Sequence, residues 1–203
     1  MAARIAIVGA GPSGSSLALF LLRQGVDPRD IVLYDKATFP RPKLCGGGIT
    51  FRGTELLEDL VGRPTGGGET VGLEFRSRIG HFPVREIGKQ WVYDRGELDA
   101  QLLDAVRNAG VPIREGVQVK AIVAGHGGRR IETQHGAETH AWVVGADGAT
   151  SLVRREAGLR GGIVGRLVEG VFESVSANVS DDVLYFCLLY TSPSHETVLD
   201  LVC

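Results

Sequence analysis

The stretch RIAIVGAGPSG, residues 4–14, decides the fold because a short apolar run ends at a glycine and a helical pattern follows closely. Residues 15–25 carry apolar side chains at helical spacing and end at a glycine. Residues 31–35, IVLYD, form a second short apolar run that is typical of a buried strand. A strand, a helix and a second strand in this order indicate a βαβ unit, so we predict an α/β fold with a parallel sheet.

The turn between the first strand and the helix contains Gly9, Gly11 and Gly14 in the pattern G-x-G-x-x-G. Such glycines let a pyrophosphate approach the backbone, and the helix N-terminus adds oriented N–H groups and a partial positive charge. Asp35 ends the second strand, where a carboxylate accepts hydrogen bonds from ribose hydroxyls. We therefore predict a Rossmann-like domain in which these four residues and Ser13 bind a dinucleotide.

Composition excludes several classes of function. The chain has 203 residues, a net charge of -2 and no concentrated basic face, so we expect no nucleic-acid partner. Its three cysteines, Cys45, Cys187 and Cys203, lack metal-site spacing, and we expect neither a metal site nor a disulfide framework. No apolar run approaches the roughly 18 residues of a membrane span. We expect a cytoplasmic protein that touches a membrane only through its substrate.

The rest of the chain alternates between strand-like and helix-like segments. We expect helices over 51–62 and 96–110, the second capped by Asp94, with a loop over 64–70 and strands over 70–77 and 81–87. Four strand-like pieces, 111–116, 117–125, 129–134 and 140–148, fit a small antiparallel meander. A helix over 151–158 with Ser151 as its N-cap and a strand over 166–179 complete the pattern. Histidines 81, 126, 135 and 140 show no catalytic or metal-ligand spacing and are predicted to lie on the surface.

Two further segments resemble a known fold. Residues 143–155, VVGADGATSLVRR, resemble the second flavin fingerprint of the FAD-dependent hydroxylase fold, and residues 92–106, VYDRGELDAQLLDAV, with Arg95 before a helix, resemble the arginine segment of the same fold. Within that fold, RPKLCGGGI at 41–49 most resembles the geranylgeranyl reductase family. The resemblance implies bound FAD, NAD(P)H as a transient electron donor, and hydride delivery to isolated double bonds of an isoprenoid or other lipid-like substrate.

The resemblance also implies roles for individual residues of the nucleotide site. Asp147 accepts from a ribityl or ribose hydroxyl and Gly148 permits the turn, although a plain helix-start turn is the alternative for Asp147. Arg95 binds phosphate oxygens or, alternatively, forms an exposed salt bridge. Val119 contacts the adenine or is an ordinary core valine.

The glycine run after Cys45 is assigned to the flavin ring. The resemblance implies that Gly46, Gly47 and Gly48 let backbone N–H groups lie against the flat ring and its carbonyl edge, where negative charge gathers on reduction. Cys45 lies near the reacting alkene, where it shapes the pocket or supports proton delivery, or else it is a packing residue.

The expected domain organisation is an FAD-binding domain over 1–160, with a substrate-domain insertion at about 63–93, and the start of a truncated β-rich substrate domain over 161–186. Residues 187–203 lack helical and strand periodicity, and residues 187–192 can be back-translated to a sequence that resembles a sequencing-transposon end, so we interpret 187–203 as a non-native tail. A genuine C-terminal strand and loop is the alternative. Two other functions remain open: an aromatic-type flavin monooxygenase, and an inactive FAD- or ADP-binding fragment.

Overall fold

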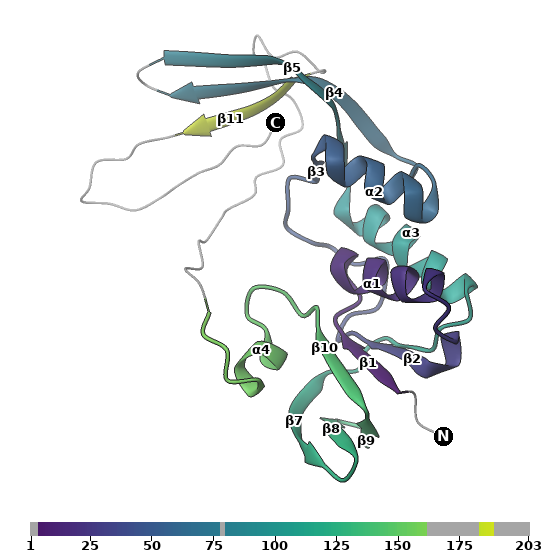
Figure 1. Cartoon of the computed structure of the whole chain (residues 1–203). Helices are drawn as coiled ribbons and strands as arrows, with labels where there is room; N and C mark the ends of the chain where they lie inside the picture. The colour runs from purple at the N-terminus through teal and green to yellow at the C-terminus, as the bar shows by residue number, and fades with distance from the viewer. Residues whose placement is uncertain (1–3, 78–79, 162–182, 189–203) are drawn as a thin grey trace, which may run out of the picture. The chain divides into compact units, whose positions relative to one another are not determined.

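The computed structural model describes residues 4–77, 80–161 and 183–188, which form two compact units (Figure 1). Among these residues, the first unit contains 4–41, 60–62 and 96–161. The second unit contains 42–59, 63–77, 80–95 and 183–188.

A four-stranded parallel sheet lies at the centre of the first unit. Its strands are β1 (Ile5–Val8), β2 (Ile31–Tyr34), β6 (Ile113–Arg114) and β10 (Trp142–Gly145), in the order β10-β1-β2-β6. Helix α1 (Pro12–Arg23) and the short 3₁₀ helix η1 (Pro28–Asp30) connect β1 to β2. The predicted βαβ unit and the α/β class are therefore confirmed.

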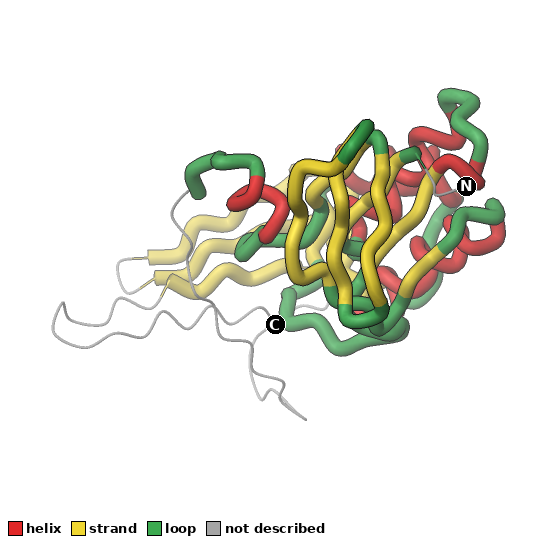
Figure 2. Tube along the Cα trace, turned by 90° about the horizontal axis from the view of Figure 1, so that it is seen from below, coloured by secondary structure: helices red, strands yellow, loops and turns green. Residues whose placement is uncertain are grey.

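Both faces of the two central strands β1 and β2 are buried, which explains why these two strands are continuously apolar. Ile7, Ile31 and Leu33 share one core with apolar residues of α1 and of helix α3 (Arg95–Asn108). The alternate residues of β1 and β2 share a second core with Ile122 and Ile131 of the strands described next. Successive side chains of a strand point to opposite faces of the sheet, so a single apolar run contributes side chains to both cores. In Figure 2 the strands of this unit, in yellow, lie in front of its helices, in red.

The second core is covered by a three-stranded antiparallel meander of β7 (Val119–Gly125), β8 (Gly128–Thr133) and β9 (Gly136–His140). The sequence analysis assigned four pieces to this meander, and that assignment is wrong at both ends. The first and last pieces are β6 and β10, which join the parallel sheet beside β2 and β1. Strand β9 was missed because four of its five residues are exposed, so it has no apolar alternation.

The second unit contains an antiparallel hairpin of β4 (Gly67–Ser77) and β5 (Gly80–Tyr93). Strand β3 (Gly48–Ile49) pairs with β5, and β11 (Val183–Leu188) runs parallel to β4. Helix α2 (Phe51–Val61) follows β3 and agrees with the helix predicted over 51–62. The predicted loop over 64–70 is wrong from Gly67 onward, because the hairpin begins there.

Strand β11 includes Cys187 and Leu188, the first two residues of the segment that the sequence predicts to be a non-native tail. The strand predicted over 166–179, and residues 189–203, lie outside the described residues. Within the described part of the chain, no helix combines the length and the apolar composition that crossing a bilayer requires.

A buried polar cluster joins the parallel sheet to the meander. The Tyr34 hydroxyl lies 3.1 Å from His140 Nε2 and donates to Glu138 Oε2, also at 3.1 Å. His140 is only 1% exposed, so the prediction that it lies on the surface is wrong. Its partner Tyr34 is distant in the sequence, and only the fold brings the two side chains together. Burial raises the pKa of the Tyr34 hydroxyl, and the negative charge of Glu138 acts in the same direction.

This raised pKa predicts a loss of stability in alkaline solution. Above about pH 10 the unfolded chain loses the Tyr34 proton while the folded chain keeps it, so the free energy of unfolding falls as pH rises. For one such group, the free energy of unfolding falls by up to about 1.4 kcal/mol for each pH unit. We expect urea titrations at several pH values to show a shallower alkaline fall for Tyr34→Phe than for the unmodified chain. An equally steep fall of the unfolding free energy with pH in both proteins would contradict the raised pKa of Tyr34.

Candidate functional site

The turn between β1 and α1 contains two glycines at which a side chain would collide with backbone atoms of the chain. Gly9 has a φ of +104°, and a Cβ on it would lie 2.2 Å from the carbonyl oxygen of Ala146. A Cβ on Gly14 would lie 1.8 Å from the carbonyl oxygen of Gly9. Both distances are too short for any side chain. The first and third glycines of the pattern therefore shape the turn itself and bring it against the segment after β10.

Gly11 is different, because its own surroundings leave room beside it. Apart from its two neighbours in the chain, the only described atom within 4 Å of a Cβ placed on Gly11 is Nη2 of Arg41, at 3.4 Å. Gly11 is also the N-cap residue of α1, and glycine has no side chain that could accept from the first-turn N–H groups. The exposed Ser13 lies in that first turn. The turn therefore fits a phosphate group bound against the backbone and the helix N-terminus.

Asp35 is held beside this turn by two backbone hydrogen bonds. Its Oδ2 accepts from the N–H of Ala10 at 2.8 Å, and its Oδ1 accepts from the N–H of Ala37 at 2.9 Å. A carboxylate has about four acceptor positions, so these two bonds leave capacity for hydroxyl donors. The structure thus brings Asp35 next to the glycine turn, as expected for a residue that binds a ribose.

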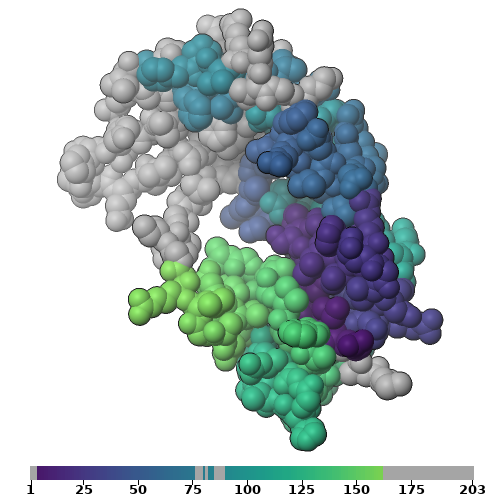
Figure 3. Space-filling view, in the orientation of Figure 1, coloured from purple at the N-terminus to yellow at the C-terminus, as the bar shows by residue number. Residues whose placement is uncertain are grey.

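Asp147 lies in the segment that packs on Gly9. Its Oδ1 accepts from the Ser151 hydroxyl at 2.5 Å and its Oδ2 from the N–H of Leu152 at 2.6 Å. Ser151 Oγ in turn accepts from the N–H of Arg154, so its predicted N-cap role in helix α4 (Leu152–Glu156) is confirmed. These bonds show that Asp147 organises the start of α4. In Figure 3 the light-green residues of this segment lie directly above the teal-green meander.

Gly148 and Val119 belong to the same unit. Gly148 has a φ of +81°, which favours glycine at the turn before α4. Val119 is half-buried at the start of β7 and packs against the core that contains Ile122 and Ile131. Its position is compatible with the ordinary core role that the sequence left open.

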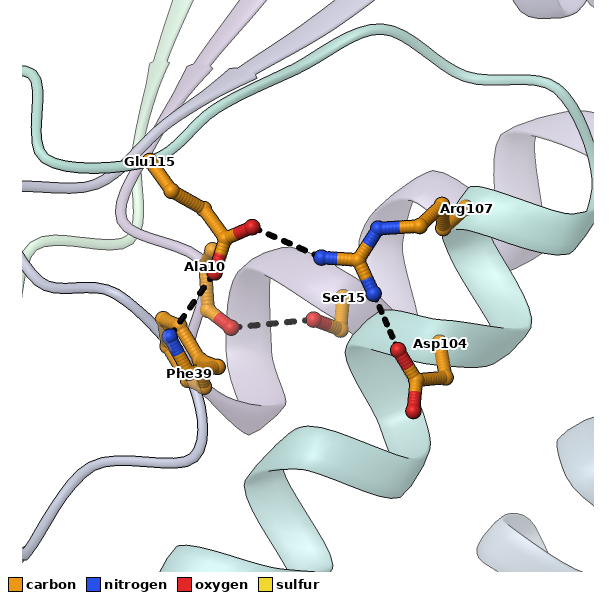
Figure 4. Close-up of polar contacts among 6 residues, drawn as sticks. All are labelled: Ala10, Ser15, Phe39, Asp104, Arg107 and Glu115. Atoms are coloured by element: carbon orange, nitrogen blue, oxygen red, sulfur yellow. Dashed lines mark hydrogen bonds and ion pairs between the residues drawn. The ribbon is translucent and has the colours of Figure 1, made fainter.

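The loop after β2 is anchored by Glu115, which the sequence analysis did not single out. Glu115 Oε1 accepts from the N–H of Phe39 at 2.8 Å, and its Oε2 accepts from Arg107 Nη2 at 2.7 Å. Arg107 also pairs with Asp104 on the same helix, and these contacts are drawn in Figure 4. The same view shows the Ser15 hydroxyl donating to the carbonyl of Ala10 at 3.0 Å, within the glycine turn. Helix α3 therefore holds the loop that leads to Arg41.

The remaining predicted residues lie in the second unit. Cys45 is exposed, Gly46 is half-buried, Gly48 begins β3, and Arg95 begins α3. Gly47 has a φ of +71°, and a Cβ on it would lie 1.9 Å from the carbonyl oxygen of Tyr93. The N–H of Tyr93 donates to the Gly47 carbonyl at 3.1 Å. The middle glycine of the run is therefore required by the contact between this loop and β5, whatever else the loop binds.

Comparisons with known proteins agree with the fold. A model of the FAD binding domain family matches residues 2–199. Menaquinone reductase of Mycobacterium tuberculosis (strain ATCC 25618 / H37Rv) is 47% identical over 58 residues, which cover 29% of this chain and 14% of the relative. Rifampicin monooxygenase of Rhodococcus hoagii is 31% identical over 159 residues, which cover 74% of this chain and 33% of the relative.

Solved structures share the fold as well. The halogenase PltM in complex with phloroglucinol and FAD aligns with a TM-score of 0.61 at 16% identity, over 77% of this chain and 36% of that one. At this identity the likeness shows the fold alone. The chain spans well under half the length of each of these relatives.

Proposed function

Because the chain belongs to the FAD binding domain family, we propose that it is the FAD-binding part of an oxidoreductase that reduces isolated double bonds of an isoprenoid substrate. The main support for FAD binding is the glycine turn, where Gly11 leaves room for a phosphate and Asp35 is held beside it. When bound, FAD supplies reversible two-electron chemistry. NAD(P)H is the proposed transient donor of those electrons.

The residues divide by the part of FAD that each would hold. Gly11, Ser13 and the first-turn N–H of Gly14 would bind the pyrophosphate, with Gly9 shaping the turn. Asp35 would accept from the ribose hydroxyls. The other proposed contacts are phosphate at Arg95, adenine at Val119, ribityl or ribose hydroxyls at Asp147 and Gly148, and the flavin ring at Gly46 and Gly48.

Two observations favour different chemistry at the flavin. The reductase assignment is supported by the Cys-Gly-Gly-Gly run and by the local similarity to a menaquinone reductase. A FAD-dependent monooxygenase is the second candidate, since the similarity to rifampicin monooxygenase extends over 74% of the chain. The two candidates require different co-substrates, and oxygen therefore separates them.

We expect the full-length protein that contains this chain to saturate a polyprenyl double bond without oxygen. The protein is loaded with FAD, reduced with NAD(P)H in an anaerobic chamber and mixed with a polyprenyl substrate. The mass of the product is then measured by mass spectrometry. A reductase product gains two hydrogens per double bond. Turnover that occurs only in air and adds an oxygen atom would overturn the reductase assignment in favour of the monooxygenase.

Cys45 is the residue proposed to lie near the reacting alkene, and Gly47 is proposed to contact the flavin ring, where it takes part in catalysis. Of the two, only Cys45 can be substituted without disturbing a backbone contact of the loop. Substituting Gly47 would disturb its backbone contact with Tyr93. We expect Cys45→Ala to keep FAD bound but to slow alkene reduction or to change which double bonds react. Leu44→Ala, at the neighbouring residue, which is 75% exposed, is the matched control for disturbing the loop. An unchanged rate and product pattern in Cys45→Ala would leave the cysteine without a role in catalysis.

A further inference from the structure

The two faces of the β4–β5 hairpin differ where β4 begins. On one face, a Cβ on Gly67 would lie 2.3 Å from Cε1 of the Tyr93 ring, and Tyr93 is only 4% exposed. On the other face, apart from its chain neighbours, no described atom lies within 4 Å of a Cβ on Gly68. Packing among the described residues therefore requires a glycine at position 67 but not at position 68.

A strip of small residues crosses this second face from β4 to β3. Gly68 pairs with Val92 of β5, and Val92 pairs on its other side with Gly48 of β3. Residues directly opposite each other in an antiparallel ladder lie on the same face of the sheet. Gly68 and Gly48 are exposed, and Val92 is half-buried. These three residues, here called the glycine strip, end in the Cys-Gly-Gly-Gly run that is assigned to the flavin ring.

Thr70 lies beside the glycine strip and carries a polar group that the fold leaves unused. It follows Gly68 by two residues on β4, so its side chain points to the same face. Thr70 is 6% exposed, and its hydroxyl has no hydrogen-bond partner among the described residues, although Gln90 lies opposite it in the register. A buried hydroxyl without a partner lowers stability, and valine has nearly the same shape and suits a strand. Packing of the described residues therefore does not explain a threonine here.

We propose that Thr70 is a specificity-determining residue, whose hydroxyl binds the oxygen atom of an isoprenoid with a polar end group while the apolar chain lies along the glycine strip. The inference rests on the proposed isoprenoid substrate and names the part of it that is recognised. Glycines let a ligand approach the backbone closely. Because Gly68 leaves space beside Thr70, rotation about the Cα–Cβ bond of Thr70 can turn its hydroxyl toward the strip.

A structural role is the competing explanation, in which the Thr70 hydroxyl binds another part of the full-length protein. That role predicts that Thr70→Val destabilises the full-length protein and affects every ligand equally. The proposed role predicts a selective loss for ligands that carry an oxygen atom. Geraniol and the hydrocarbon that lacks only its hydroxyl group share the same chain, so the ratio of their dissociation constants isolates the hydrogen bond to Thr70.

The experiment uses the full-length protein loaded with oxidised FAD and follows each titration by the change in flavin absorbance. We expect Thr70→Val to weaken geraniol binding by about 5- to 10-fold, as for loss of one neutral hydrogen bond, and to change hydrocarbon binding by less than about 2-fold. Thr70→Ser keeps the hydroxyl and should keep the ratio of the unmodified protein. Gly68→Val fills the strip and should weaken both ligands. The urea midpoint of Thr70→Val should be unchanged or higher, because no structural hydrogen bond is lost.

Each outcome decides the inference. If the unmodified protein binds geraniol and Thr70→Val keeps its ratio, Thr70 has no role in specificity, while the proposed reduction of an isoprenoid still stands. Unfolding of Thr70→Val, or a clear fall in its urea midpoint, would assign the hydroxyl to the structure instead. Unchanged binding of both ligands by Gly68→Val would remove the glycine strip from the site. If the unmodified protein binds neither ligand, the proposed isoprenoid substrate fails and this inference fails with it.

Discussion

Gly14→Ala is expected to disrupt the folding of the first unit, at a cost of more than about 3 kcal/mol in the free energy of unfolding. The added Cβ would lie 1.8 Å from the carbonyl oxygen of Gly9 and 3.0 Å from its carbonyl carbon. Both are backbone atoms of the turn, which cannot rotate away as a flexible side chain can. Helix propensity alone favours Ala over Gly by about 1 kcal/mol in a helix, so a large loss can only come from this contact.

The matched control for this prediction is Gly11→Ala in the same turn. The nearest contact of its Cβ is the end of the Arg41 side chain at 3.4 Å, so the unfolding free energy should change by less than about 1 kcal/mol. Amide hydrogen exchange of residues 5–23 in the two variants, read by mass spectrometry, compares them within one segment. Protection of that segment in Gly14→Ala equal to that in Gly11→Ala would show that the turn relaxes easily and that the packing argument is wrong.

Some elements of the first unit were predicted correctly because their patterns report on neighbours in the chain. The apolar runs at β1 and β2 and the N-cap at Ser151 are of this kind. The predicted start of α1 was three residues late because the apolar spacing begins after Gly14. Pro12 holds the first helical position, where its fixed φ suits the helix and its missing N–H costs nothing.

The partners that complete the site could not be predicted, because they are distant in sequence and carry no local signal. Glu115 lies 76 residues from Phe39, and His140 lies 106 residues from Tyr34. Arg41 was predicted only as part of the glycine-run motif, while its pairing with Asp99 depends on how α3 packs beside the turn. The glycines illustrate the same limit. Their spacing predicted the turn, and only the structure separates Gly9 and Gly14, which shape it, from Gly11, which leaves room beside it.

Gly11→Val is expected to lower FAD affinity by about 100-fold or more while the chain stays folded. A branched side chain at this position would occupy the space where the pyrophosphate meets the backbone, and at least two charge-assisted hydrogen bonds to the phosphates would be lost. Its only described non-neighbouring contact is the movable end of Arg41, so the fold can accommodate the change. FAD binding is measured by quenching of flavin fluorescence, with far-ultraviolet circular dichroism as the check on folding.

Gly68→Val serves as the control for adding the same side chain elsewhere. Among the described residues, no atom lies within 4 Å of a Cβ on Gly68, which is a strand position where a β-branched residue is favourable. This variant should bind FAD like the unmodified chain. If Gly11→Val also bound FAD with unchanged affinity, the space beside Gly11 would not be the phosphate site. The packing roles of Gly9 and Gly14 would stand, because they rest on the chain's own atoms, but the assignment of the turn to FAD would lose its main structural support.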